Sequence, residues 1–183
     1  LNLFYGMMMH EFGGRIKPRL FNYFWIDDFS AARNFAKTQC AGDWIFWLDG
    51  DDHLEPVSIE ALKDFPNWKS HQTRKLDAIK FPCVMGDTWG FQFRIFKNLE
   101  TIKWQGEYHE TVDDSVEQGG YSAAAYDHVK IFHTGTPTRE KTERTIRILS
   151  KMPEVWKKWY YIDSEYAVIG DFNASLLCSL QAL

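Results

Sequence analysis

A short apolar run that ends in a cluster of acids is the feature that most constrains how this chain can fold. Trp44–Leu48 contains only apolar residues, and Asp49-Gly50-Asp51-Asp52 follows it directly. A run of this length is typical of a strand that is buried on both faces. Three carboxylates so close together repel one another unless a cation lies among them, and the glycine lets the backbone turn tightly. The alternative interpretation is an acidic surface turn that caps the next helix.

The elements around this run favour an α/β domain. Leu20–Ile26 is predicted to be a strand, Phe29–Ala41 a helix with one apolar face, and Pro56–Phe65 a second helix. Strands and helices that alternate in this order indicate a parallel sheet. Ligands bind at the carboxyl ends of the strands in such sheets. The acidic turn lies at such an end.

The rest of the chain predicts short strands and then helices. A helical region is expected from Thr136-Pro137 onwards, so we divide the chain into an α/β domain at residues 1–137 and a helical extension at residues 138–183. We also expect a short helix at Leu3–Phe12, closed by Gly13-Gly14. The expected strands are Ala78–Val84, Phe91–Phe96, Thr101–Trp104 and Tyr126–Phe132.

Charge and cysteine content exclude several classes of protein. The net charge of −4 provides no large basic field that would hold nucleic acid. The basic run at Arg139–Arg147 alternates with glutamates, which is typical of a solvated helix face. The three cysteines form no CxxC pair, so neither a zinc site nor a disulfide framework is indicated, and we expect a cytoplasmic location. No apolar run is long enough to span a bilayer.

Several residues outside the acidic turn have side chains suited to chemistry. His133 ends a predicted strand, and imidazole is a common metal ligand, although a lone histidine there is more often structural. Glu110 beside His109 is a candidate general base, with an ordinary surface turn as the alternative. Arg33 and Arg94 are candidates to pair with carboxylates or phosphate, although most arginines are simply solvated.

Four segments together resemble the family-2 glycosyltransferases, which are inverting enzymes with the GT-A fold. The first resembles the W-x-x-D-F-S-x-A-R-N segment of that family, and the second resembles the strand that leads into its D-x-D motif. The third resembles the R-x-F … W-x-G-x-x-H-E block, and the fourth resembles the closing H-x-G. In this chain they are Trp25–Asn34, Asp43–Asp52, Arg94–Glu110 and Ile131–Gly135, within about residues 20–147.

The resemblance implies a fold, a metal and a set of site residues. The implied fold is a GT-A-like (Rossmann-like) mixed sheet flanked by helices, with a C-terminal helical extension. Mn²⁺ or Mg²⁺ is the implied metal, and Glu110 is implied to take the proton from the acceptor hydroxyl. The implied metal ligands are Asp49, Asp51 and His133. The implied donor-binding residues are Asp28, Arg33, Asn34, Asp49, Asp52, Arg94, Trp104 and His109.

The expected donor is a nucleotide-sugar, with a UDP-sugar favoured, and the acceptor stays open among a carbohydrate, a lipid-linked sugar, a protein and a modified base. The first strand and loop of this family, which hold the nucleotide base, have no counterpart in the sequence, so we expect an N-terminally shortened catalytic domain. Two other classes stay open. One is a metal-dependent phosphoesterase or nuclease. The other is a degenerate glycosyltransferase-like module that binds without catalysis.

Overall fold

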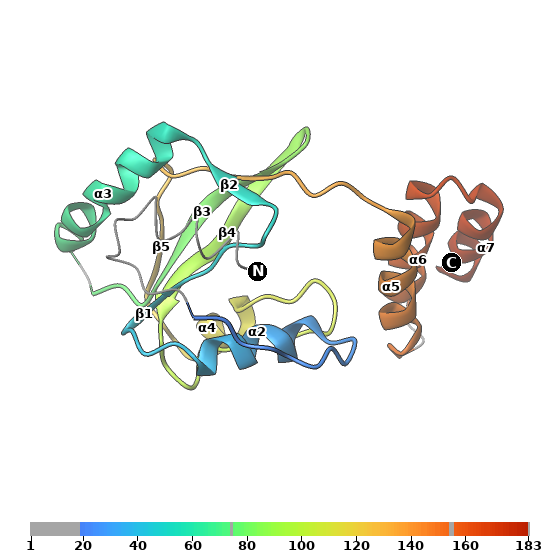
Figure 1. Ribbon diagram of the computed structural model, residues 1–183, viewed down its shortest axis with the longest axis horizontal. Helices are drawn as coiled ribbons and strands as arrows, with labels where there is room; N and C mark the ends of the chain where they lie inside the picture. Colours follow the sequence, from blue (N-terminus) through green and yellow to red (C-terminus); the bar gives the residue numbers. More distant parts are fainter. Residues whose placement is uncertain (1–18, 74, 154–155, 183) are drawn as a thin grey trace.

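The molecule has two parts, a sheet with flanking helices and a separate group of three helices (Figure 1). The computed structural model describes residues 19–73, 75–153 and 156–182. We call residues 19–133 the sheet unit and residues 139–182 the helical unit; residues 134–138 join them. The sheet unit is mixed α/β, as expected. The short helix predicted at Leu3–Phe12 lies outside the described residues.

Within the described residues the sheet has six strands, and its pairing is mixed rather than parallel. The order is β1-β4-β3-β6-β2, with β5 also paired to β3. β3 is parallel to β5 and β6, whereas the β1–β4, β3–β4 and β2–β6 pairs are antiparallel. The parallel sheet that the order of elements indicated is therefore wrong, whereas the mixed sheet flanked by helices that the resemblance implied is confirmed. The strands are β1 (Trp44–Phe46), β2 (Asp52–Leu54), β3 (Ala78–Met85), β4 (Thr88–Lys97), β5 (Ala123–Ala125) and β6 (Ile131–His133).

Local chemistry explains where the helices begin. The Asp28 carboxylate accepts from the backbone N–H of Ala31 and caps α2. Pro56 occupies the first turn of α3, where its missing N–H costs nothing. The predicted starts of both helices are confirmed, although α3 continues beyond the predicted end. The helices are α2 (Phe29–Thr38), α3 (Pro56–Ser70), α4 (Asp113–Gln118), α5 (Arg139–Ser150), α6 (Trp156–Val168) and α7 (Phe172–Ala182). None of them is long and apolar enough to cross a membrane.

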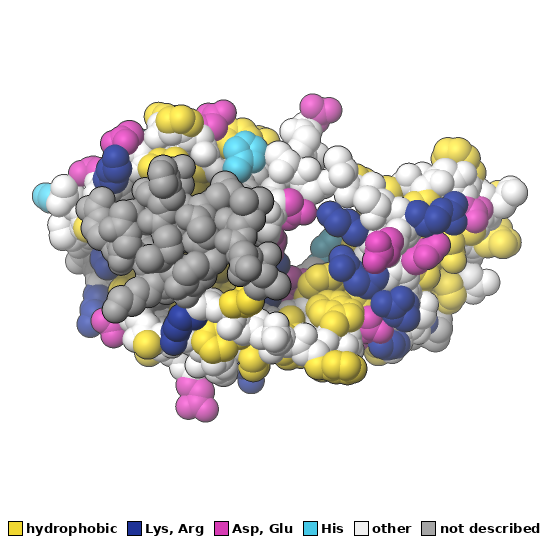
Figure 2. Space-filling view, in the orientation of Figure 1, with side chains coloured by type: hydrophobic (Ala, Val, Ile, Leu, Met, Phe, Trp, Pro, Cys, Tyr) yellow, Lys and Arg dark blue, Asp and Glu magenta, His cyan; other side chains and the backbone are white. Residues whose placement is uncertain are grey.

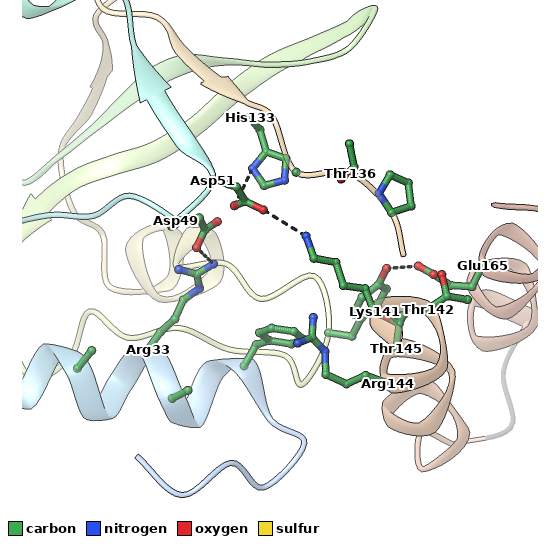
Figure 3. A pocket seen from close by; sticks show the side chains of 17 residues that line it. Arg33, Asp49, Asp51, His133, Thr136, Lys141, Thr142, Arg144, Thr145 and Glu165 are labelled. Carbon is green, nitrogen blue, oxygen red and sulfur yellow. Dashed lines mark hydrogen bonds and ion pairs between the residues drawn. The ribbon is translucent and has the colours of Figure 1, made fainter. Parts of the chain in front are cut away.

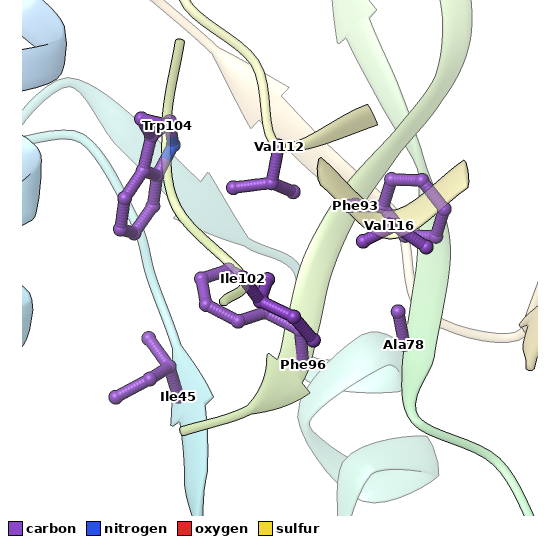
Figure 4. Packing of buried hydrophobic residues seen from close by; sticks show 8 residues of the cluster. All are labelled: Ile45, Ala78, Phe93, Phe96, Ile102, Trp104, Val112 and Val116. Atoms are coloured by element: carbon purple, nitrogen blue, oxygen red, sulfur yellow. The ribbon is translucent and has the colours of Figure 1, made fainter. Parts of the chain in front are cut away.

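The core of the sheet unit lies on both faces of the β3–β4 pair, because side chains alternate along a strand. Phe81 and Ile79 point to the face that α3 covers with Phe65. Phe93 points to the opposite face, which Val116 of α4 covers. Figure 4 shows this second cluster, which consists of Ile45, Ala78, Phe93, Phe96, Ile102, Trp104, Val112 and Val116.

The segment Leu20–Ile26 forms no strand, so that prediction was wrong. Its aromatic residues instead pack on the neighbouring helix. The ring of Tyr23 lies 5.1 Å from that of Phe35, and the ring of Trp25 lies 4.8 Å from that of Phe29. Its apolar content therefore reflects contact with α2 rather than membership of the sheet.

Other strand predictions also needed correction. Thr101–Trp104 forms no strand, because its backbone bonds to a local carbonyl and to side chains rather than to a neighbouring strand, while Ile102 and Trp104 enter the core. The strand predicted at Tyr126–Phe132 is limited to β6. The run Trp44–Leu48 is not buried on both faces, since β1 is an edge strand and only Ile45 is buried within it. β2, β5 and α4 were not predicted from the sequence.

The helical unit packs around its own small core and contacts the sheet unit at several places, among them two sites with side-chain hydrogen bonds. Leu149, Ile162 and Cys178 form the centre of that core. The Asp27 carboxylate accepts hydrogen bonds of 3.0 Å from Arg147 on α5. At the second place, Tyr108 donates a hydrogen bond to Glu165 on α6. With the 134–138 connection, these contacts hold the helical unit beside the acidic turn.

Candidate functional site

The pairing of β2 with β6 assembles a group of metal-ligand side chains. Asp52 lies directly opposite His133 in this antiparallel register. The turn before β2 is tight, since the Asp52 N–H donates to the Asp49 carbonyl at 3.1 Å. Both the N–H and the hydroxyl of Thr134 donate to the Asp51 carbonyl at 2.9 Å. As a result, one ligand atom each of Asp49, Asp51, Asp52 and His133 lies within 4.8 Å of the others.

Asp52 is the buried member of this group and holds the others in place. Its side chain is 0% exposed, and one oxygen accepts from Nη1 of Arg94 at 2.6 Å. Burial by itself would raise the pKa of Asp52. Hydrogen bonds from the Asp49 N–H, from His133 and from Arg94 outweigh burial, so the pKa is lowered. Asp52 therefore stays ionised in the core, where it supports the ligands rather than facing the open side.

His133 is oriented by this buried carboxylate. Its Nδ1 lies 3.0 Å from Asp52 Oδ1, so Nδ1 carries the proton and Nε2 is the nitrogen left to accept a metal. A side chain at Gly135 would intrude here. A Cβ atom at that position would meet a carboxylate oxygen of Asp51 and lie 2.6 Å from Nε2 of His133. The space between the two ligands exists because residue 135 is glycine.

Arg33 connects the acidic turn to the predicted base. Its Nη2 lies 2.8 Å from Asp49 Oδ1, and its Nε lies 2.5 Å from Glu110 Oε1. The guanidinium also lies over the Trp47 ring. Burial would lower the pKa of Arg33, but the charges of Asp49 and Glu110 outweigh it and raise the pKa. Arg33 thus fixes two of the predicted site residues relative to each other.

The acidic turn opens into a cleft of about 650 Å³ between the sheet unit and the helical unit. Asp49, Asp51 and His133 line one side, while Lys141 and Arg144 of α5 line the other. Figure 3 shows Lys141 reaching across to Asp51, where its Nζ lies 3.4 Å from Oδ2. Figure 2 shows basic side chains along the edge of the helical unit that borders the opening. Sequence reasoning missed this wall, because it assigned Arg139–Arg147 to a solvated helix face.

The Glu110 side chain is 11% exposed and lines a second cavity of about 370 Å³. Trp104 and His109 line this cavity too. Desolvation by neighbouring rings, among them Tyr161 of α6, lowers the pKa of His109, although much of the residue stays open to solvent. Since Arg33 lines the first cleft and contacts Glu110, the two cavities meet at this ion pair.

The remaining predicted donor-binding residues have structural contacts away from the main cleft. The Asp28 carboxylate caps α2. Asn34 clamps the backbone of Trp104, donating to its carbonyl at 2.9 Å and accepting from its N–H at 3.0 Å. Arg94 is 3% exposed and bonds Asp52 and the Cys83 sulfur from within the core. That these residues contact the sugar donor stays a prediction.

Part of the chain is similar in sequence to part of a larger protein. No protein-family model matches the chain. A TPR repeat-containing protein of Synechococcus elongatus is 38% identical to it over 98 residues, which make up 50% of this chain and 23% of that protein. The chain therefore spans less than a quarter of that relative's length.

Proposed function

We propose that this chain is the catalytic part of a metal-dependent inverting glycosyltransferase of the GT-A type. The observation that carries the proposal is the arrangement of Asp49, Asp51 and His133 on one side of a cleft, with Arg33 linking Asp49 to Glu110. The motifs of the sequence supply the class of enzyme. The geometry supports it, because the motif residues converge although they are far apart in the chain.

The residues of the acidic turn fit a divalent metal. Carboxylate oxygens with one imidazole suit Mn²⁺ or Mg²⁺. Asp49, Asp51 and His133 would hold the ion, while buried Asp52 fixes the ring of His133 from behind. The bound ion would offset negative charge on the departing diphosphate. Gly135 keeps the space between Asp51 and His133 free.

The proposal assigns different roles to the two cavities. The cleft between the units would hold the nucleotide-sugar, with a UDP-sugar favoured, because the metal-ligand residues line it. The acceptor hydroxyl would approach from the neighbouring cavity, where Glu110 would take its proton. Arg33 would keep Glu110 at a fixed position relative to Asp49. A single displacement at the anomeric carbon would then invert its configuration.

The alternative is a degenerate module that binds a nucleotide-sugar without turning it over. The Lys141–Asp51 contact favours this alternative, because an ammonium group already lies beside the proposed metal ligand. The phosphoesterase alternative requires a second metal, and the described residues contain one group of this type. Glycosyl transfer therefore ranks first.

Calorimetric titration with UDP, with and without Mn²⁺, tests the proposal. We expect metal-dependent binding that Asp51→Ala abolishes. Asp87→Ala is the matched control, since this carboxylate lies in the β3–β4 turn, and it should bind UDP as the wild type does. Release of UDP from UDP-sugars is the second readout. Glu110→Gln should keep UDP binding and lose at least about 100-fold in turnover. If the wild type binds UDP without turnover, the degenerate module replaces the enzyme.

A further inference from the structure

The wall of the cleft that α5 provides has the opposite charge to the acidic turn. Lys141 and Arg144 face the cleft from the helical unit, and the buried hydroxyl groups of Thr142 and Thr145 lie between them. The one acid on this wall, Glu165, already accepts a hydrogen bond from Tyr108 at 2.9 Å. A ligand in the cleft would therefore have the carboxylates of the proposed metal site on one side and cationic side chains on the other.

Arg144 has a donor that the described residues leave unused. Its Nε atom is buried and has no hydrogen-bond partner among the residues that the structure describes. Its guanidinium lies over the faces of aromatic rings, 5.2 Å from the ring centre of Phe29 and 5.8 Å from that of Trp25. A buried donor without an acceptor is costly. The rings hold the planar group in place, as is suitable for recognition of a phosphate.

Lys141 is the mobile counterpart of this fixed cation. Its Nζ is 3.4 Å from the Asp51 carboxylate, and its side chain is 46% exposed. A divalent ion on Asp51 would repel this ammonium group, since both are positive and close together. The flexible lysine stem would let the charge turn to an anion next to the metal. A diphosphate bound to that metal is such an anion.

We propose that Lys141 and Arg144 form a diphosphate-binding site, so that the helical unit supplies half of the donor pocket. The inference rests on the proposed function, in which the acidic turn holds the metal. A small, doubly charged phosphate group fits better than a nucleic acid, because the cations lie inside a cleft and are few.

Calorimetry on the full chain tests this inference with UDP and Mn²⁺ as the probe. Lys141→Ala and Arg144→Ala should each weaken UDP binding by about 10-fold or more, because each removes a charge-assisted hydrogen bond. Arg139→Ala is the matched control, since this arginine lies on the same helix turn, does not line the cleft and should bind normally. Arg144→Lys keeps the positive charge, so its affinity for UDP should fall less than that of Arg144→Ala.

Titration with Mn²⁺ alone provides a readout that misfolding cannot mimic. Lys141→Ala should bind Mn²⁺ at least as tightly as the wild type, because it removes a positive charge beside Asp51. Opposite changes in Mn²⁺ and UDP affinity would support the site.

Unchanged UDP affinity in both alanine variants, with binding still lost in Asp51→Ala, would overturn the inference and leave the proposed function standing. Pyrophosphate is the second probe. Pyrophosphate binding that depends on Lys141 and Arg144, in a protein that does not bind UDP, would support the anion site and refute the proposed function. A wild type that binds neither probe would overturn both.

Discussion

Gly135 shows how much the site depends on a side chain that is missing. Gly135→Ala would place a methyl group against the Asp51 carboxylate and the His133 ring, and the ring is held in place by Asp52, so the two side chains would have to move apart from their shared space. We expect Mn²⁺ affinity to fall at least about 10-fold with little change in secondary structure, as measured by calorimetry and circular dichroism.

Gly50→Ala is the matched control for this change. A Cβ atom on Gly50 meets nothing within 4 Å, although this glycine lies in the acidic turn itself. It should bind Mn²⁺ normally. An equal loss of Mn²⁺ affinity in Gly135→Ala and Gly50→Ala would contradict the steric explanation.

The buried Arg94–Asp52 pair should matter for stability. Arg94→Met removes the partner of a carboxylate that is 0% exposed, and breaking such a pair costs about 3–5 kcal/mol. Urea unfolding should show this loss. Because the cost comes from the uncompensated charge, the Arg94→Met, Asp52→Asn double variant should lose less than the two single changes added together. An additive result would contradict this account.

The pH dependence of stability should report the same carboxylate. The pKa of Asp52 is lower in the folded protein than its ordinary value of 3.8. A group of this kind adds stability above its unfolded pKa, and this stability is lost as the pH falls through the folded pKa. The free energy of unfolding should therefore decline below about pH 4. Asp52→Asn should make this acid-induced decline smaller, and an identical decline in both proteins would refute the assignment.

Residue patterns predicted the acidic half of the site but not the basic half. Asp49 and Asp51 are adjacent to an apolar run, so a local motif marks them. Lys141 and Arg144 lie in a helix whose charges alternate in sign, as in an exposed helix. Only the docking of the helical unit turns these cations toward the cleft. That docking depends on Asp27 and Arg147, which are 120 residues apart in the chain.

At the scale of elements, α2 holds the loop that carries Glu110. Asn34 makes two hydrogen bonds to the backbone of Trp104, and Ser30 donates one to the Gly106 carbonyl. The N–H of Phe29 on the same helix donates to the Glu107 carbonyl, and a bridge pairs Gln105 with Thr111 within the loop. The position of Glu110, the proposed base, therefore depends on the position of α2.

Asn34→Ala should loosen that loop. It leaves the backbone N–H and carbonyl of buried Trp104 without their partners, at a cost of about 1–3 kcal/mol for each group. Hydrogen exchange should accelerate at residues 104–111 while β3 and β4 stay protected. Thr38→Ala, on the exposed end of the same helix, is the control. Faster exchange throughout the sheet unit would contradict a local role.

The β3–β4 hairpin was predictable, whereas the β2–β6 pair was not. Two β-rich runs flank Gly86, whose φ of +57° suits the turn, so local sequence indicates that hairpin. β2 has three residues, two of them polar, and pairs with residues about 80 positions later. Such a short polar strand exists because of tertiary pairing, which no local pattern records.

At the scale of the whole molecule, one carboxylate fastens the two units together. Arg147 and Lys151 both donate hydrogen bonds to Asp27, and these bonds hold the pKa of Asp27 well below its usual range. Asp27 has a φ of +60°, a strained conformation that a short polar residue tolerates best. The two units are therefore joined twice, by the 134–138 connection along the chain and by this ion pair.

Asp27→Ala should let the helical unit move away from the sheet unit without unfolding either of them. Small-angle scattering should show a larger radius of gyration, and high salt should produce part of the same change in the wild type by screening the exposed pairs. Asp87→Ala is the control, since that carboxylate lies in the β3–β4 turn of the sheet unit. An unchanged radius in Asp27→Ala would mean that the Tyr108–Glu165 contact is sufficient to hold the units.

The register of β2 against β6 also sets an order of events during synthesis. Asp52 leaves the ribosome 81 residues before His133. At a synthesis rate of about 5–20 residues per second, His133 is added several seconds after the acidic turn. Arg94 arrives about halfway through this interval and can neutralise Asp52 first, whereas Asp51 gains its contact with His133 only when β6 forms. A nascent chain halted before residue 131 would therefore contain the acidic turn yet lack the histidine of the proposed metal site.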